Sequence, residues 1–347
     1  MNKKNLTNLS LLCLTEFLVS LGLPKYRGIQ VFSWLYRPKI TDFSQMTDLS
    51  KKLRETLAAR ACFTWPQIAE VERSRDGTVK YGFKLDDDNY IEAVLIPEEG
   101  RNTLCVSSQV GCAMACGFCL TGSIGFRRNL TPGEIVGQVV RVRDWLLDTN
   151  DLPNGLNNLV FMGMGEPLAN FDNLLIALEI LTQQRGLDFS ERRITVSTCG
   201  LVPQIIELGQ KTKVNLAVSL HSVDNSIRSK LMPINKKYRV AELLEACRNF
   251  PMPKRKRIMF EYILIKDLND SEADAELLAQ KLKGIPCKIN LLPYNESAGQ
   301  PFKRPSDVRI ELFQKALWKA GYTVLVRSSR GADISAACGQ LAGKMTT

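Results

Sequence analysis

The sequence predicts an α/β protein built around a partial, open β/α barrel, preceded by a small N-terminal helical domain and a β-hairpin extension. Three observations support this fold class. Residues 1–60 place apolar side chains at helical spacing, and residues 61–97 alternate with a period of two between turn residues. From residue 98 to residue 333, strand-like and helix-like segments alternate, which is typical of a parallel sheet. About six βα units are too few for a closed eight-fold barrel, so we expect an open one.

In the N-terminal domain we expect helices over residues 9–22, 27–36 and 48–60. The first of these is apolar enough to resemble the core of a signal peptide. Glu16 interrupts the apolar run, Pro24 follows it, and no small-residue cleavage site comes next, so a buried amphipathic helix is favoured. No stretch reaches 18 uninterrupted apolar residues, and the sequence therefore predicts no membrane span.

The extension at residues 61–97 reads as a hairpin over 68–73 and 79–85, turning at Asp76 and Gly77, with a further strand over 90–97. For the core, strands are predicted near 103–108, 156–162, 192–198, 213–220, 257–265, 287–293 and 322–327. Helices are predicted near 132–148, 171–184, 200–210, 224–231, 239–250, 270–283 and 306–320. Active sites of such folds lie at the carboxyl ends of the strands. Residues 334–347 form a C-terminal tail that carries Cys338.

Composition narrows the function classes. The 347 residues are 45% hydrophobic and 24% charged, which excludes a disordered, collagenous or coiled-coil chain. Forty-six basic against 36 acidic residues give a net charge of +10, which favours a polyanionic partner. The chain has one histidine, His221, so histidine-rich metal sites are excluded and a Ser-His-Asp hydrolase would depend on that residue alone.

Three of the ten cysteines fall within eight residues, as Cys112, Cys116 and Cys119. A secreted disulfide framework would spread pairs through a short chain, so we expect a reducing compartment with a metal or redox role for this cluster. A closed zinc site needs four ligands. Three thiolates on a cubane iron–sulfur cluster leave one iron open to bind and reduce a cofactor. A zinc site, a redox pair or three unrelated buried cysteines remain the alternatives.

The CxxxCxxC spacing, with Phe118 before the last cysteine, resembles the radical S-adenosylmethionine (SAM) superfamily, and Met162–Pro167 resembles its GGE segment. Further motifs make the chain similar to the radical SAM RNA adenine methyltransferases of the RlmN/Cfr type. They are Leu104–Cys112, Met162–Pro167, Ser219–His221, Pro233–Lys237, Lys288–Asn295 and Ala337–Gly343. The resemblance covers residues 90 to 343, and no motif residue departs from it.

The resemblance implies two cofactors: a [4Fe-4S] cluster on Cys112, Cys116 and Cys119 with one open iron, and SAM, used twice per turnover. It also assigns the SAM contacts, each at or just past a predicted strand end. They are Gly165, Glu166, Ser197, Ser219, Leu220, His221 and Asn295. The remaining cysteines are interpreted as structural.

The resemblance further implies a radical route, because the C2 and C8 carbons of adenine are not nucleophiles. One SAM methylates Cys338, and a second yields a 5′-deoxyadenosyl radical that activates this methyl for addition to the adenine ring. Cys105 then attacks the sulfur of the RNA–protein adduct and releases the product, leaving a Cys105–Cys338 disulfide. Glu92, a carboxylate in an apolar strand, corresponds to the proposed general base that removes the ring proton.

The implied substrate is C2 of an adenosine in the peptidyl transferase centre of 23S rRNA and, in some members, the adenosine 3′ of the tRNA anticodon. The resemblance also leads us to expect an electron donor such as a flavodoxin system, a monomer and a cytoplasmic location. We expect RNA contacts from the N-terminal domain, where Tyr26, Trp34 and Tyr36 alternate with basic residues. Further phosphate contacts are expected from the basic runs Lys51-Lys52, Arg127-Arg128, Arg192-Arg193, Lys236-Lys237 and Lys254–Arg257.

Three alternatives remain open at this stage. A C8 methyltransferase that confers antibiotic resistance would share the same cysteines, although Pro233–Lys237 and Cys338–Gly343 look closer to the C2 branch. A radical SAM enzyme acting on a peptide or small molecule would not need Cys105 and Cys338 as a pair. A zinc-binding RNA protein would contain zinc and no sulfide.

Overall fold

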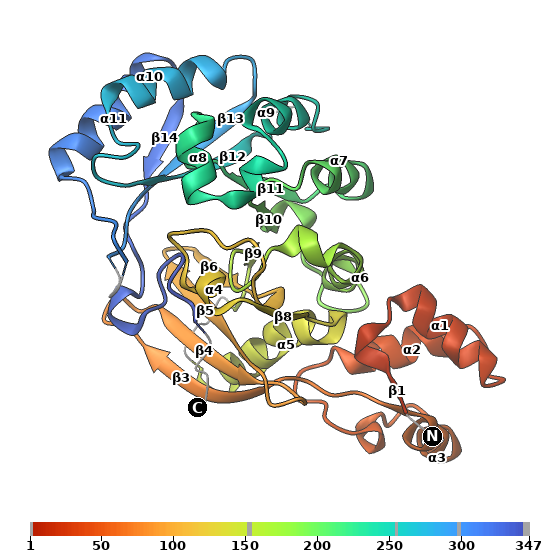
Figure 1. Cartoon of the computed structure of the whole chain (residues 1–347). Helices are drawn as coiled ribbons and strands as arrows, with labels where there is room; N and C mark the ends of the chain where they lie inside the picture. Colours follow the sequence, from red (N-terminus) through yellow and green to blue (C-terminus); the bar gives the residue numbers. More distant parts are fainter. Residues whose placement is uncertain (1–2, 151–154, 254–255, 297–299, 343–347) are drawn as a thin grey trace.

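The computed structural model describes residues 3–150, 155–253, 256–296 and 300–342. Its main feature is a ten-stranded sheet in the order β14-β13-β12-β11-β10-β9-β6-β5-β4-β3, with helices packed along its outer face (Figure 1). From β6 to β14 the neighbouring strands pair in parallel, as an open β/α barrel requires. They are β6 (Arg101–Cys105), β9 (Asn158–Phe161), β10 (Ile194–Thr198), β11 (Asn215–Ser219), β12 (Ile258–Leu264), β13 (Cys287–Pro293) and β14 (Thr323–Val326). The expected fold class is confirmed, and each predicted core strand has its counterpart.

The helices that cover the sheet also match the predicted ranges. They are α5 (Pro132–Thr149), α6 (Phe171–Thr182), α7 (Val202–Lys211), α8 (Asn225–Leu231), α9 (Val240–Arg248), α10 (Glu272–Lys281) and α11 (Asp307–Lys319). Helix α5 begins with a capping box, in which Thr131 and Glu134 each accept from the other's backbone N–H.

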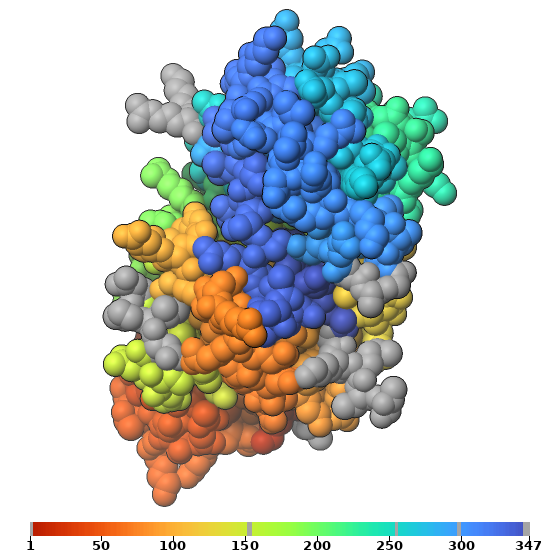
Figure 2. Space-filling model, turned by 90° about the vertical axis from the view of Figure 1, so that its left-hand side faces the viewer, coloured from red at the N-terminus to blue at the C-terminus, as the bar shows by residue number. Residues whose placement is uncertain are grey.

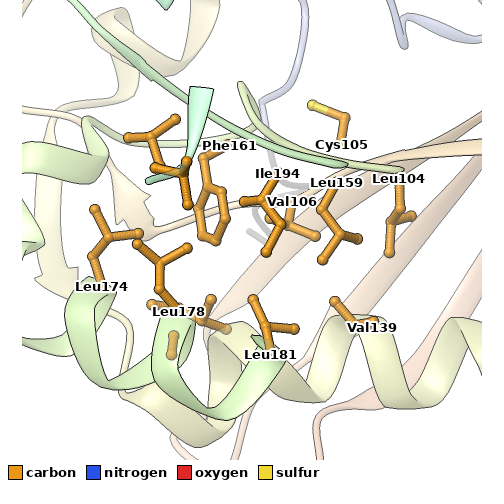
Figure 3. Packing of buried hydrophobic residues seen from close by; sticks show 14 of the residues in the cluster. Leu104, Cys105, Val106, Val139, Leu159, Phe161, Leu174, Leu178, Leu181 and Ile194 are labelled. Carbon is orange, nitrogen blue, oxygen red and sulfur yellow. The ribbon is translucent and has the colours of Figure 1, made fainter. Parts of the chain in front are cut away.

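Successive side chains of β6 point to opposite faces of the sheet, and only one of these faces is covered by the outer helices. Leu104 points toward α5 and α6, where it joins Leu159, Ile194 and Leu178 in the hydrophobic core (Figure 3). Cys105, the next residue, points to the opposite face of the sheet (Figure 3). The outer helices therefore bury one face of β6, and Cys105 faces away from them.

The β-hairpin extension continues the main sheet. Strands β3 (Gln67–Arg73), β4 (Val79–Lys84) and β5 (Tyr90–Glu98) pair antiparallel, and β5 pairs antiparallel with β6. The register sets Val94 opposite Cys105. Because residues two apart on a strand share a face, Glu92 projects to the same side of the sheet as Cys105.

The three N-terminal helices are confirmed as α1 (Leu11–Ser20), α2 (Tyr26–Leu35) and α3 (Lys51–Arg60). Leu14 and Leu18 of α1 are fully buried, in agreement with an amphipathic helix. Among the described residues, no helix is both long enough and apolar enough to cross a membrane. The parallel pair β1 (Lys4–Asn5) and β2 (Ala61–Cys62) was not predicted, because two residues carry no periodic signal.

The structure corrects one expectation about RNA contacts in this region. Tyr26 is 54% exposed, but Trp34 and Tyr36 are 7% and 2% exposed and belong to the hydrophobic core. The indole N–H of Trp34 donates to Asp48, and the Arg37 guanidinium stacks on its ring. Of these three aromatic residues, only Tyr26 is available to stack on a base.

Candidate active site at the carboxyl ends of the strands

The three clustered cysteines lie on one loop between β7 (Gln109–Gly111) and α4 (Leu120–Ile124). Strand β7 pairs with β8 (Phe126–Asn129), and the Cys112 N–H donates to the Gly125 carbonyl (3.0 Å). A Cβ at Gly111 would lie 1.8 Å from that carbonyl oxygen, so this close backbone approach requires glycine. The Gly117 N–H donates to Leu231 at the end of α8 (2.9 Å), which ties the loop to the barrel.

The donor set on this loop fits an iron–sulfur cluster. All three cysteines are free thiols, and Cys112 and Cys119 are close enough to Cys116 for their charges to raise its pKa further, in addition to burial. Burial raises the pKa of Cys112 to about 12. Within the described residues, no three histidine, cysteine or carboxylate groups converge on one metal ion. A cubane cluster does not require this, because each cysteine binds a different iron.

The C-terminal tail lies directly on the cluster loop and its helix. The Leu120 N–H donates to the Gly339 carbonyl (2.7 Å), and the Thr121 hydroxyl donates to the Leu341 carbonyl (2.6 Å). Figure 2 shows the dark blue tail packed against the orange strands of the extension. These contacts bring Cys338, distant in sequence, to the mouth of the barrel.

The Cys338 thiol is close enough to Cys105 to affect the pKa of Cys105. Burial, and then the nearby Cys338 thiol, raise the pKa of Cys105 to about 12. Cys338 has solvent-exposed surface, but protein atoms crowd its thiol, and this crowding together with the Glu261 carboxylate raises its pKa to about 11. Gly339, next to Cys338, packs against Phe118 and Cys119, and Ala342 binds Glu92, so the tail that carries Cys338 lies beside the cluster loop on the face of the sheet to which Cys105 projects.

The glycine-rich segment after β9 is fixed by the side chains of Gln109, on β7, and of Ser107, just before β7. The Met164 N–H donates to the Ser107 hydroxyl and the Glu166 N–H to the Gln109 amide oxygen, both at 2.8 Å. Glu166 is buried, and its carboxylate accepts from the N–H groups of Leu168 (3.0 Å) and Cys199 (2.7 Å). Its side chain thus connects the ends of β9 and β10, and burial raises its pKa.

Replacing Gly165 with alanine is expected to weaken SAM binding by at least about tenfold. Gly165 has φ +100°, and a Cβ there would lie 2.5 Å from the Gln109 side chain and 2.8 Å from its backbone nitrogen, so the segment must shift. Equilibrium dialysis of the anaerobic, cluster-loaded protein measures the change. Gly321→Ala is the control, because Gly321 has φ +87° with nothing within 4 Å of its Cβ position. Equal SAM affinity in both variants would contradict this prediction.

The remaining predicted SAM residues lie along the same strand ends. Ser197 is buried one residue before the end of β10, and Ser219 ends β11. The Leu220 N–H donates to the Glu261 carbonyl (3.0 Å). Asn295, just past β13, accepts from the Ser329 hydroxyl. Their roles in SAM binding are predictions.

His221 lies fully within the barrel at φ +58°. Its Nδ1 accepts from the Ile263 N–H (3.0 Å), so the ring proton belongs on Nε2. Burial lowers its pKa to about 3, with a further contribution from the charge of Arg228, so the ring is neutral. The Phe118 ring contacts it edge to face at 4.7 Å between centroids, which connects His221 to the cluster loop.

Arg228 is the main residue that the sequence did not predict. It is fully buried and donates to the carbonyls of Cys199 (2.7 Å), Ser219 (3.2 Å) and Leu220 (3.1 Å) and to the Asn235 side chain (3.0 Å). Burial lowers its pKa to about 10, so it stays cationic near pH 7. Arg228 joins the loops after β10 and β11 to the Pro233–Lys237 motif. That motif was therefore the sequence signal that could have pointed to Arg228.

Two further buried ionisable residues were also missed. Glu261 on β12 accepts from the Asn290 amide (2.9 Å), and burial raises its pKa to about 7. Lys80 on β4 is 3.6 Å from Glu92, the predicted base. Glu92 itself is 5% exposed, and its other carboxylate oxygen accepts from the Ala342 N–H (3.0 Å). Glu92 therefore faces the tail rather than bulk solvent.

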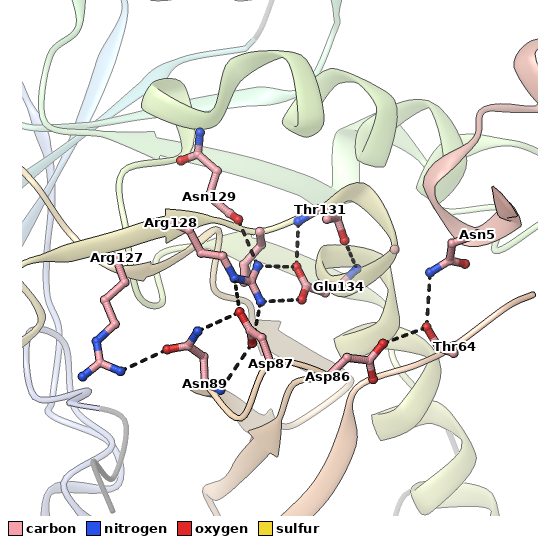
Figure 4. A network of polar contacts seen from close by, with 12 residues as sticks. Asn5, Thr64, Asp86, Asp87, Asn89, Arg127, Arg128, Asn129, Thr131 and Glu134 are labelled. Carbon is pink, nitrogen blue, oxygen red and sulfur yellow. Dashed lines mark hydrogen bonds and ion pairs between the residues drawn. The ribbon is translucent and has the colours of Figure 1, made fainter. Parts of the chain in front are cut away.

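The basic runs differ in their availability to RNA. Arg128 is held between Asp87 and Glu134 at 2.6–2.9 Å, and Arg127 donates to Asn89 (3.1 Å) (Figure 4). Arg128 is thus already paired, which argues against its predicted phosphate contact. Lys51-Lys52, Arg192-Arg193 and Lys236-Lys237 are exposed. The run at Lys254–Arg257 lies partly outside the described residues.

Comparison with known proteins agrees with this geometry. Residues 4–63 match the ribosomal RNA large subunit methyltransferase N-terminal domain, and residues 106–278 match the radical SAM superfamily. The dual-specificity RNA methyltransferase RlmN of Desulfotalea psychrophila is 56% identical, with 99% of this chain and 96% of that one covered. The enzyme of the same name from Geobacter sulfurreducens is 53% identical, with 96% and 90% covered. A solved radical SAM methyltransferase from Sphaerobacter thermophilus superposes with a TM-score of 0.91 at 45% identity, with 97% of this chain and 99% of that one covered.

The open barrel, the three-cysteine loop at its mouth and these matches define a radical SAM enzyme, which uses a [4Fe-4S] cluster and SAM. High identity over nearly the whole length narrows the assignment. The chain belongs to the RlmN family of RNA methyltransferases.

Proposed function

We propose that this chain methylates C2 of a specific adenosine in the peptidyl transferase centre of 23S rRNA, and the adenosine 3′ of the anticodon in some tRNAs. The observation that carries the proposal is that the Cys338 tail is hydrogen-bonded to the helix after the cluster loop and to Glu92, on the face of the sheet to which Cys105 projects. Two cysteines so placed suit a route in which one carries the methyl group and the other releases the product by thiol–disulfide exchange.

Bound cofactors supply the methyl group and the 5′-deoxyadenosyl radical for this chemistry. The chain's own residues do the rest. Cys112, Cys116 and Cys119 hold the cluster, and residues at the strand ends from Gly165 to Asn295 orient SAM. Cys338 carries the methyl group to the adenine. Glu92 takes the ring proton. Cys105 then attacks the sulfur of Cys338, the electron pair of the bond from this sulfur to the former methyl carbon goes to that carbon, and the carbon takes up a proton to become the methyl group as the disulfide forms.

We assign residues 1–60 to RNA binding, residues 61–97 to a connection that shares the sheet, residues 98–333 to the radical SAM core and residues 334–347 to the tail. The net charge of +10 and the exposed basic runs support phosphate contacts. A flavodoxin-type donor, a monomeric state and a cytoplasmic location complete the proposal.

The test is an anaerobic reconstitution with iron and sulfide, followed by SAM, a reductant and unmodified 23S rRNA or tRNA. Mass spectrometry of the nucleosides is expected to find 2-methyladenosine, together with 5′-deoxyadenosine, and none from Cys338→Ala. 8-Methyladenosine would assign the chain to C8 chemistry instead. SAM cleavage without an RNA product would indicate a peptide or small-molecule substrate, and bound zinc without sulfide would contradict a radical enzyme.

A further inference from the structure

Lys80, on β4, is a buried lysine whose ammonium group contacts three oxygen atoms. It is 6% exposed and lies 3.0 Å from a Glu72 carboxylate oxygen, 3.6 Å from Glu92 Oε1 and 2.6 Å from the Ile334 carbonyl. Burying an ammonium group costs free energy unless the group is paired. The three oxygen contacts offset this cost and fix where the Lys80 ammonium lies. The contacts surround a cavity of about 260 Å³ that Asp333 and the tail residues Gln340 and Ala342 also line.

The sheet register places Lys80 on the face that carries the reactive cysteine. Glu72, Lys80, Val94 and Cys105 are paired in turn across β3, β4, β5 and β6. Paired residues share a face, and Glu92 lies two positions from Val94, so these side chains all project to one side. Lys80 is therefore a near neighbour of the proposed base on the reactive side of the sheet.

The tail is fixed to this cluster on both sides of Cys338. Ile334, four residues before Cys338, accepts from the Lys80 ammonium, and Ala342, four residues after it, donates its N–H to Glu92 Oε2 (3.0 Å). Asp333 is further held by the Ser74 hydroxyl (2.6 Å). The base and the segment that carries Cys338 are thus positioned by one connected set of contacts.

We propose that Lys80 is a positioning residue that holds the Glu92 carboxylate ionised and fixed against the Cys338 tail. This inference rests on the proposed function, in which Glu92 accepts the ring proton and must lose it again before the next turnover. Among the described residues, the charged groups that line this cavity with Glu92 are Lys80 from β4, Glu72 from β3 and Asp333, just before the tail. Without the lysine, the described charged groups that line this cavity are three carboxylates, and nearby like charges disfavour the charged form of Glu92 that acts as a base.

The test compares Lys80→Met with wild type by the rate of 2-methyladenosine formation across pH. At pH 7 the rate is expected to fall at least about tenfold. The acidic limb of the profile moves to higher pH, so the two rates approach each other under alkaline conditions. Lys80→Gln, which can donate a hydrogen bond but has no charge, is expected to show the same displacement, and Lys80→Arg is expected to restore the wild-type profile. Lys84→Met is the matched control on β4, since Lys84 is exposed and pairs with Asp88.

A second measurement is independent of activity. Hydrogen exchange in the cofactor-free chain is expected to speed up at residues 334–336 in Lys80→Met and to stay unchanged in the outer helices. Wild-type exchange at the tail, or an unshifted pH profile in both uncharged variants, would overturn the role of Lys80. A wild-type chain that makes no 2-methyladenosine would contradict the proposed function instead, so the two failures are distinguishable.

Discussion

Replacing Cys105 with alanine is expected to accumulate a covalent species between the protein and its RNA substrate. The adduct forms through Cys338, but the thiol that resolves it is missing, so turnover falls at least about a hundredfold. Cys105 is buried at the end of β6, on the face of the sheet that the tail covers, and burial and the Cys338 thiol both raise its pKa. A denaturing gel shows the species as a nuclease-sensitive band, and mass spectrometry places the nucleotide on the peptide that contains Cys338.

The matched control is Cys247→Ala. Cys247 is buried on α9 and, like Cys105, has a pKa raised by burial to about 12, but the thiol that adds to this shift is Cys287 rather than Cys338. We expect near wild-type turnover and no crosslink from this variant. If Cys105→Ala forms no crosslink under conditions in which wild type methylates RNA, the assigned roles of the two cysteines are wrong.

Replacing Arg228 with methionine is expected to lower the free energy of unfolding by roughly 3 kcal/mol or more. The substitution leaves the buried carbonyls of Cys199, Ser219 and Leu220 without their charged donor. Because Ser219 ends β11 and Leu220 follows it, SAM affinity is expected to fall as well. Calorimetry of the cofactor-free chain measures the loss of stability separately from cofactor binding.

Arg248→Met is the control for this prediction. Arg248 lies exposed on α9 and pairs with Glu245 on its own helix, so its loss should change stability by less than about 0.5 kcal/mol. A melting temperature for Arg228→Met that equals that of the control would show that other donors compensate for the guanidinium.

Much of the fold could be predicted because its signals are local. The core strands are short apolar runs, and helices such as α5 begin with a capping box that the sequence displays directly. The predicted extension was confirmed strand by strand, but its continuity with β6 depends on register between strands, which no local pattern encodes. Strands β1 and β2 were not predicted, because two residues are too few to show a periodic pattern.

The residues of the candidate site also fall into those that a local sequence pattern predicts and those that only the tertiary structure shows. The cysteine loop and the glycine-rich segment are contiguous motifs, so the sequence identified them. Arg228 and Lys80 were missed because a lysine or arginine is most often exposed, and only tertiary structure shows that these two are buried and paired. Trp34 and Tyr36 illustrate the opposite error, in which aromatic residues beside basic ones were interpreted as an RNA surface and proved to be core.

The pairing of β5 with β6 also determines where this chain can be divided. A fragment that began at residue 98 would retain all the parallel strands of the ten-stranded sheet but would expose the backbone of β6 along the edge that β5 now covers. An unpaired edge of this kind frays or recruits a strand from another molecule. Because Cys105 ends β6 and pairs with Val94, the loss of β5 would disturb the position of Cys105 first. The catalytic half of the molecule is therefore not separable at the boundary that its motifs suggest.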